Sequence, residues 1–295
     1  MTDESLMAGP APLVVGNTEG VLLAGGALLV TGVRRRAPVT EEWLRAHVRY
    51  FSADGGGRGA RWPGPEESAD PSLERRIFNL CGLVSADLAD RLIASAGSSD
   101  AWSSVRHDRH PARDLPVSLL ADEAARSELF SVLEEGAIPA AAALFGVPLD
   151  HLSLKDVFIV RYDAATDHDR LERHVDGESF TGVSCTGRIG LASGMHARPR
   201  GTNLTGSAAS PGSFASVNIL LSAADDFSGG GTGFAAFGWR PEAVPNIRRG
   251  DALLHRGDAE HCGLPVTRGT RYIAVAFVRT RVVDADAGCK VAGGG

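Results

Sequence analysis

The sequence predicts an α+β fold in which an antiparallel double-stranded β-helix, or jelly roll, forms the core and helices support it from the outside. Two observations favour this fold. Short apolar stretches of strand length recur after residue 150, and turns rich in Gly and Pro separate them. Patterns typical of helices come before them, at residues 85–96 and 122–145. The overall composition, with 43% hydrophobic and 22% charged residues, is that of an ordinary globular protein.

Residues 1–72 form a poorly defined N-terminal region that ends in a Gly/Pro-rich linker. The linker, at residues 53–71, carries the Gly and Pro clusters typical of a loop. Asp3 and Glu4 stand where a secretory signal would carry positive charge, and the apolar run 20–33 is short and interrupted by glycines. We therefore expect neither a signal peptide nor a membrane span, and a cytoplasmic location by default.

The main domain is predicted to span residues 73–283. Residues 76–84 suit a strand, and Ser85 has the position of a helix N-cap before a run with helical spacing. The pattern at 122–145 predicts a second, long helix that is interrupted at Pro139. We expect both helices to pack against the outside of a sheet.

Charge and cysteine content exclude several classes of protein. A formal net charge of −6 and a pI near 5.9 leave no basic stripe for phosphates, so no nucleic-acid partner is expected. The four cysteines have no paired spacing, which indicates neither a zinc site nor a disulfide framework. The loop at residues 226–234, DFSGGGTGF, lacks the Lys and Ser/Thr of a phosphate-binding loop, and we interpret it as a hairpin turn beside the mouth of a site.

Three side chains are candidates for holding a metal ion. Residues two apart in an extended segment point the same way, so the imidazole of His174 and the carboxylate of Asp176 are expected to converge. His261 lies in the predicted connection between strands at 251–255 and 272–278. Two imidazoles and one carboxylate form the facial triad that holds non-haem Fe(II) and leaves open positions. Cys262 would point to the side opposite His261, and we interpret it as a bystander.

Two further side chains extend this candidate site. Arg271 begins a row that Ile273, Val275 and Phe277 continue on one side of a strand. A cation there requires an anion, which leaves open a structural salt bridge or a bound acid. Tyr162 ends a predicted strand at 157–162, and a core tyrosine with a bonded hydroxyl is its alternative interpretation.

Three segments resemble the catalytic domain of iron- and 2-oxoglutarate-dependent protein hydroxylases. They are residues 162–176, residues 226–234 and residues 261–278, the last reading HCGLPVTRGTRYIAVAFV. Procollagen lysyl hydroxylases are the most similar in amino-acid sequence, and prolyl 4-hydroxylases share the order of the motifs. The resemblance extends over residues 75–280 and is strongest after residue 156.

The resemblance implies that His174, Asp176 and His261 ligate Fe(II) and are catalytic. It also implies that Arg271 binds the distal carboxylate of 2-oxoglutarate as a bidentate fork and that Tyr162 lies near this co-substrate. The implied activity is that of a dioxygenase that uses O2, hydroxylates a peptidyl lysine or proline side chain, and releases succinate and CO2, with L-ascorbate as a further cofactor. Two alternatives stay open: a small-molecule 2-oxoglutarate oxygenase, and a non-catalytic jelly-roll protein inactivated by an insertion.

That insertion, at residues 182–216, departs from the family pattern. In the relatives a short link follows the His-x-Asp strand, which here would join residues 179–181 directly to a strand at 217–221. The intervening residues are rich in Gly, Ser, Ala and Arg and have no apolar periodicity, which predicts a disordered insertion. A retained intron and a substrate lid are two further interpretations. Residues 284–295 are predicted to form a flexible tail.

Overall fold

The computed structural model describes a chain of 295 residues over residues 13–15, 18–22, 28–33, 37–51, 60–61, 77–104, 112–177, 213–239 and 247–280. The expectations for the tail at 284–295, for residues 182–212 of the predicted insertion and for most of the N-terminal region lie outside these residues and stay predictions. Three strands near the N-terminus form a small sheet of their own in the order β1-β2-β3: β1 (Leu13–Val15), β2 (Thr18–Leu22) and β3 (Leu28–Val33).

The large sheet contains nine strands, and every pairing in it is antiparallel. Its order is β5-β4-β6-β13-β10-β15-β8-β7, with β11 on the edge of β15. The strands are β4 (Val48–Phe51), β5 (Ala60–Arg61), β6 (Ile77–Leu80), β7 (Arg113–Pro116), β8 (Leu152–Asp163), β10 (Ala215–Leu220), β11 (Phe227–Gly229), β13 (Ala252–Arg256) and β15 (Val266–Thr280).

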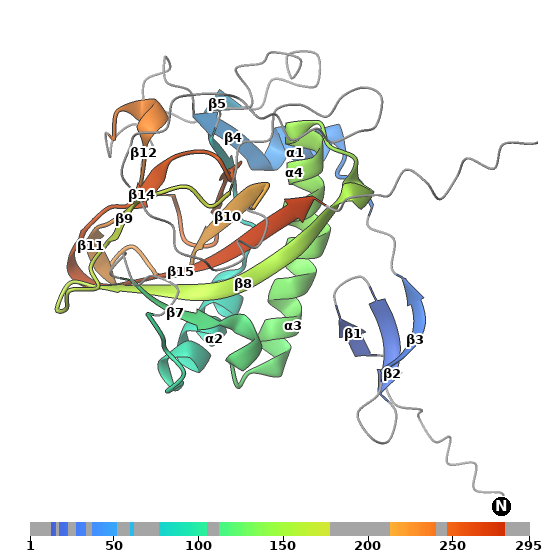
Figure 1. The fold of residues 1–295 in the computed structure, drawn as a ribbon, viewed down its shortest axis with the longest axis horizontal. Coiled ribbons are helices and arrows are strands. Elements are labelled where there is room, and N and C mark those ends of the chain that lie inside the picture. The colour runs from blue at the N-terminus through green and yellow to red at the C-terminus, as the bar shows by residue number, and fades with distance from the viewer. Residues whose placement is uncertain are drawn as a thin grey trace, which may run out of the picture.

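A small sheet faces the large one and completes the predicted jelly roll. It contains β9 (Leu171–His174), β12 (Thr232–Phe234) and β14 (His261–Gly263) in the order β12-β14-β9. Figure 1 shows these three strands on one side of β8 and β15, and α2 and α3 on the other. The α+β fold class and the outside position of the helices are therefore confirmed.

The helices cover one face of the large sheet. They are α1 (Glu41–His47), α2 (Ala86–Gly97), α3 (Glu123–Val132) and α4 (Ile138–Phe145), with short 3-10 turns η4 (Val117–Leu119) and η6 (Leu149–His151). A further 3-10 turn, η7 (Ala235–Phe237), follows β12 of the small sheet, and its Phe237 packs against Phe234. Apolar side chains of α2, α3 and α4 pack against every second residue of β8, β10 and β15, such as Ile159, Ile219 and Ala276. Because side chains alternate along a strand, the intervening residues face the space between the two sheets.

The predicted helix at 122–145 is broken into three pieces. Asp122 caps α3, and a π-helical turn, η5 (Leu133–Ala137), separates α3 from α4. Pro139 stands in the first turn of α4, where its missing N–H costs least. In a regular helix the proline ring would clash with the carbonyl group four residues earlier, which accounts for the π-helical turn just before Pro139. Ser85 caps α2, as predicted.

Two sequence predictions about strands are wrong. The glycine-rich loop at 226–234 is not a hairpin, because β11 pairs with β15 and β12 pairs with β14. Three glycines in a row with positive φ, Gly229 at 74°, Gly230 at 70° and Gly231 at 102°, carry the chain from one sheet to the other. His261 is not in a connection but begins β14.

The last residues of the insertion predicted at 182–216, residues 213–216, are ordered and buried. Ser213 and Ser216 are fully buried, and β10 already begins at Ala215. These small residues lack an apolar pattern, yet they fit a tightly packed place between neighbouring backbones. Among the described residues, no helix is long and apolar enough to cross a membrane.

Candidate active site

The two histidines of the candidate site face each other across the small sheet. His174 on β9 is the direct antiparallel partner of His261 on β14. Next to this pair the register shifts, because Leu171 is already the partner of Gly263. Two residues of β9 thus oppose one of β14, and this bulge lets both Leu171 and His174 line the same pocket.

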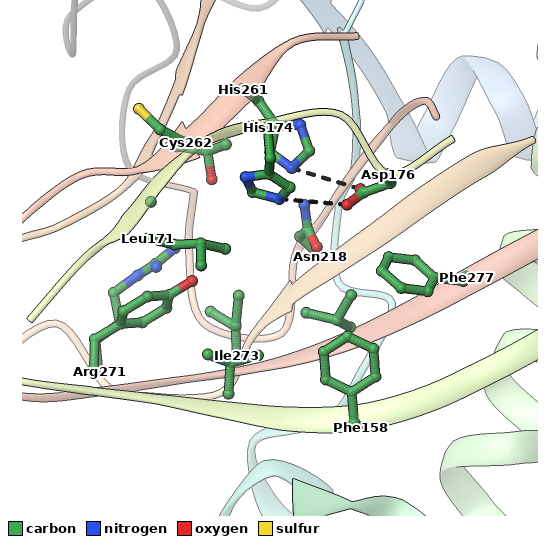
Figure 2. Close-up of a pocket in the computed structure, with 15 residues that line it drawn as sticks. Phe158, Leu171, His174, Asp176, Asn218, His261, Cys262, Arg271, Ile273 and Phe277 are labelled. Carbon is green, nitrogen blue, oxygen red and sulfur yellow. Dashed lines mark ion pairs between the residues drawn. The ribbon is translucent and has the colours of Figure 1, made fainter. Parts of the chain in front are cut away.

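Asp176 lies between the two imidazoles. Its Oδ1 is 3.4 Å from Nε2 of His174, and its Oδ2 is 3.5 Å from Nε2 of His261. The two rings are 4.3 Å apart between centroids, and the three donor atoms lie within 4.8 Å of one another (Figure 2). His174 and Asp176 converge as the alternation of an extended chain predicts.

Backbone carbonyl groups fix the orientation of both imidazoles. Nδ1 of His174 is 2.7 Å from the carbonyl oxygen of Glu172, and Nδ1 of His261 is 2.9 Å from that of Ala259. Since a carbonyl oxygen only accepts, each Nδ1 carries a proton, and each Nε2 is the nitrogen that faces Asp176 and can bind a metal ion when the ring is neutral.

Hydrogen bonds to its side chain and to its backbone fix the position of Asp176. The hydroxyl of Ser216 donates a hydrogen bond of 2.6 Å to Oδ2. The backbone N–H of Asp176 donates to the carbonyl of Gly257, and its carbonyl accepts from the N–H of Ser213. The chain therefore has a fixed path on both sides of residues 178–212.

Burial and mutual charge set the protonation of this cluster. Burial opposes ionisation of Asp176, but the imidazoles of His261 and His174 hold the pKa of its carboxyl well below the usual range. For His174, burial lowers the pKa, while the hydrogen bond and charge of Asp176 outweigh it and raise the pKa overall. Burial lowers the pKa of His261 below its ordinary value.

The donor set fits a non-haem iron. Two neutral imidazole nitrogens and one ionised carboxylate oxygen are the ligands of a 2-His-1-carboxylate facial triad, which leaves positions open for other ligands. Among the described residues, these three are the only His, Cys, Asp or Glu side chains that gather in this way. Cys262 lines the rim of the pocket, but its Sγ points away from the imidazoles (Figure 2).

Arg271 is a buried cation in the same pocket. Its side chain belongs to a residue that is 4% exposed, and Nε has no hydrogen-bond partner. The guanidinium lies 5.5 Å from the ring centroid of Tyr162, and no described carboxylate forms an ion pair with it. The structural salt bridge is thus not present among the described residues. Gly230 makes room for this side chain, since a Cβ there would lie 2.9 Å from Cδ of Arg271.

Tyr162 lines the pocket beside this guanidinium. It is the cross-strand partner of Arg271 and is 2% exposed. Burial raises the pKa of its hydroxyl to about 12, so it stays protonated at neutral pH. The hydroxyl has no hydrogen-bond partner in the described part of the chain, so its alternative role as a satisfied core tyrosine lacks support.

Two further polar residues next to the three donors, His255 and Asn218, were not predicted from the sequence. His255 is fully buried, its ring centroid is 4.5 Å from that of His261, and burial lowers its pKa to about 3. Its Nε2 is 3.2 Å from the amide nitrogen of Asn218, which lines the pocket. The available signal was a histidine within the apolar strand at 251–255.

Comparison with known proteins supports the resemblance over part of the chain. No protein-family model matches. Over 65 residues the chain is 48% identical to procollagen-lysine,2-oxoglutarate 5-dioxygenase 1 of Mus musculus, a match that covers 21% of this chain and 8% of the mouse protein. The resemblance to lysyl hydroxylases is confirmed for this segment, which spans less than a tenth of the relative.

Two solved structures are similar to this chain at low sequence identity. The non-heme alpha ketoglutarate dependent epimerase SnoN from nogalamycin biosynthesis has a TM-score of 0.46 at 13% identity, covering 73% of this chain and 82% of that one. A Pseudomonas putida prolyl-4-hydroxylase has a TM-score of 0.44 at 14% identity, covering 74% of this chain and 99% of that one.

Proposed function

We propose that this protein is an Fe(II)- and 2-oxoglutarate-dependent dioxygenase that hydroxylates a peptidyl lysine or proline side chain and releases succinate and CO2. One observation carries the proposal. The three convergent donors, His174, Asp176 and His261, line the same pocket as the buried guanidinium of Arg271, which forms no ion pair with any described carboxylate and whose Nε has no hydrogen-bond partner. A metal site alone would not require such a cation.

The three donors would hold Fe(II), and the iron with 2-oxoglutarate and O2 would supply the oxidising chemistry. Arg271 would bind the distal carboxylate of 2-oxoglutarate through its planar fork, because burial strengthens a charge-assisted pair. The Tyr162 hydroxyl, protonated at neutral pH, would donate a hydrogen bond to the same co-substrate.

Apolar side chains form the rest of the pocket wall. Val160 and Ile273 line the pocket, and Phe158 and Phe277 pack edge to face with centroids 5.3 Å apart. Figure 2 shows this aromatic pair and Arg271 on opposite sides of the pocket. Such walls exclude water from the reacting groups, and the aromatic side offers a place for the substrate.

The proposal of a peptidyl substrate rests on the sequence match, whose mouse relative is named for procollagen lysine. L-ascorbate, implied by the resemblance, stays a prediction. Inactivation by the insertion is the less favoured alternative, since Asp176 keeps its hydrogen bonds to Ser216 and Gly257 directly before residues 178–212.

Anaerobic titration with Fe(II) and 2-oxoglutarate tests the proposal. We expect the weak visible absorption band of an Fe(II)–2-oxoglutarate complex in the wild-type protein and in Glu260→Ala, which changes an exposed neighbour of His261. Asp176→Ala should lose the band. A wild-type protein that binds no Fe(II) would refute the function. Succinate release stimulated by a metabolite and by no peptide would instead select the small-molecule oxygenase.

A further inference from the structure

Asn218 is a polar residue of the pocket that is neither a proposed metal ligand nor a proposed contact of 2-oxoglutarate. It stands on the inward face of β10, between Leu253 of β13 and Val275 of β15. It is 8% exposed and lines the pocket together with the three donors. A buried amide in such a place is expected to have partners for its hydrogen-bonding groups.

His255 determines which end of the Asn218 amide faces the pocket. Nδ1 of His255 is 2.8 Å from the carbonyl oxygen of Arg256, so Nδ1 carries the single proton of the neutral ring. Nε2 is then an acceptor. The atom of Asn218 that lies 3.2 Å from it must be the donating NH2 group.

The carbonyl oxygen of Asn218 is consequently directed into the pocket. It has no hydrogen-bond partner among the described residues, and Figure 2 shows it turned away from the imidazoles. A carbonyl oxygen only accepts, so this oxygen can take a hydrogen bond only from a group that carries an N–H or O–H. The hydroxyls of Tyr162 and Thr232, which also line the pocket, can donate as well as accept, so Asn218 differs from them.

We propose that His255 is a positioning residue that holds the Asn218 carbonyl in the pocket as the acceptor for a nitrogen donor of the substrate. This inference rests on the proposed function and refines it. A lysyl side chain carries such a donor at its end, whereas the ring of a peptidyl proline carries none. Phe158 and Phe277 line the same pocket and would cover the methylene groups of a lysyl side chain. The substrate class is therefore lysyl rather than prolyl.

The tautomer of His255 is the first test, because it does not depend on activity. Long-range 1H–15N correlation spectra of the full chain distinguish a protonated Nδ1 from a protonated Nε2. We expect His255 to be neutral with the proton on Nδ1. A protonated Nε2 would turn the Asn218 oxygen toward His255 and overturn the proposal.

The second test compares two collagen-like Gly-Xaa peptides that differ only in carrying lysine or norleucine at one position. Calorimetric titration under nitrogen, with and without Fe(II) and 2-oxoglutarate, gives both dissociation constants. We expect the lysyl peptide to bind at least about tenfold more tightly to the wild-type protein, the effect of one hydrogen bond to a charged group. The ratio should fall to about one in Asn218→Ala and in His255→Phe.

Two variants serve as controls for damage to the pocket. His255→Gln keeps an acceptor for the Asn218 amide and should restore the preference for lysine. Val275→Ala removes volume opposite Asn218 without removing a polar atom, so it should weaken both peptides and keep their ratio. Equal wild-type affinities, or an unchanged ratio in Asn218→Ala, would overturn the role of Asn218. Absence of the Fe(II)–2-oxoglutarate band would instead refute the proposed dioxygenase function. The peptide titrations without Fe(II) would still test the role of Asn218 in that case.

Discussion

Arg271 gives the sharpest prediction at the scale of single residues. Lysine at this position keeps the positive charge but loses the planar fork, so Arg271→Lys should raise the KM for 2-oxoglutarate by about one to two orders of magnitude. Fe(II) affinity should change little, since Arg271 is not a donor of the triad. Arg268→Lys, an exposed change on the same strand, is the matched control. Equal KM values for the two variants would contradict a co-substrate role.

The protonation of His174 predicts how iron binding depends on pH. Burial lowers its pKa, but Asp176 raises it above the ordinary 6.5, and an imidazole must be neutral to bind a metal. Protons therefore compete with iron as the pH falls through the raised pKa, a window that begins above pH 6.5. Below it, Fe(II) affinity should fall by about tenfold per pH unit. The pKa of His261 is lowered, so it adds no competition there. Titrations at several pH values check this, and a flat profile would contradict it.

At the residue scale, strand periodicity was sufficient to predict some of the site. The i, i+2 rule brings His174 and Asp176 together and places Arg271 in the row of Ile273, Val275 and Phe277, all of which line the pocket. Strand periodicity could not predict the hydrogen bond between Asn218 and His255, because that contact depends on the register between two strands. Register is a property of the assembled sheet and has no local signal in one sequence.

At the scale of elements, the turn after β13 is a point of close packing. A Cβ on Gly257 would lie 1.8 Å from the carbonyl oxygen of Ser213, and the Gly257 carbonyl accepts the N–H of Asp176. Gly257→Ala should therefore lower the free energy of unfolding by about 1–3 kcal/mol and weaken Fe(II) binding. Denaturant unfolding and metal titration measure both effects.

A glycine with free space provides the control for that substitution. Nothing lies within 4 Å of a Cβ on Gly97 at the end of α2, so Gly97→Ala should leave Fe(II) affinity unchanged and maintain or raise stability. If both alanine variants behaved alike, the close packing around Gly257 would have no role in placing Asp176.

Elements with a clear local pattern were predictable, whereas their partners were not. Ser85 caps α2 and the strand at 157–162 lies within β8, because capping and apolar runs are local properties. The glycines of the loop at 226–234 predict a hairpin, which the structure does not contain. Positive φ at Gly229 to Gly231 is equally compatible with a crossing between sheets, and only the long-range pairing with β14 and β15 distinguishes the two.

At the scale of the whole molecule, the two ends of residues 178–212 lie side by side in the described part of the core. Gly177 donates its N–H to Gly257, and Ser213 donates to Asp176, so the two ends of this segment meet. Replacing residues 178–212 by a short Gly-Ser linker should keep the Fe(II)–2-oxoglutarate band and its iron affinity within about twofold. A shortened protein that folds, as judged by circular dichroism, but binds no iron would show that these residues complete the centre.

The composition of residues 182–216 predicted a disordered insertion, and its last residues, 213–216, are buried in the described fold. Ser213 to Ser216 read as part of a polar, small-residue run, yet Ser216 supplies the hydroxyl that binds Asp176. Small residues suit this place because Gly177 and Gly257 pack closely against Ser213 there. Such packing depends on segments distant in the chain, which composition does not reveal.

Gly177 packs closely against Ser213, so cleavage of the chain between these two residues has a defined consequence. A single cut between residues 178 and 212 would leave His174 and Asp176 on one fragment and His261 and Arg271 on the other. The pairing of β8 with β15 would hold the two fragments together in native buffer. Neither purified fragment would retain a ferrous ion, and mixing them would restore retention.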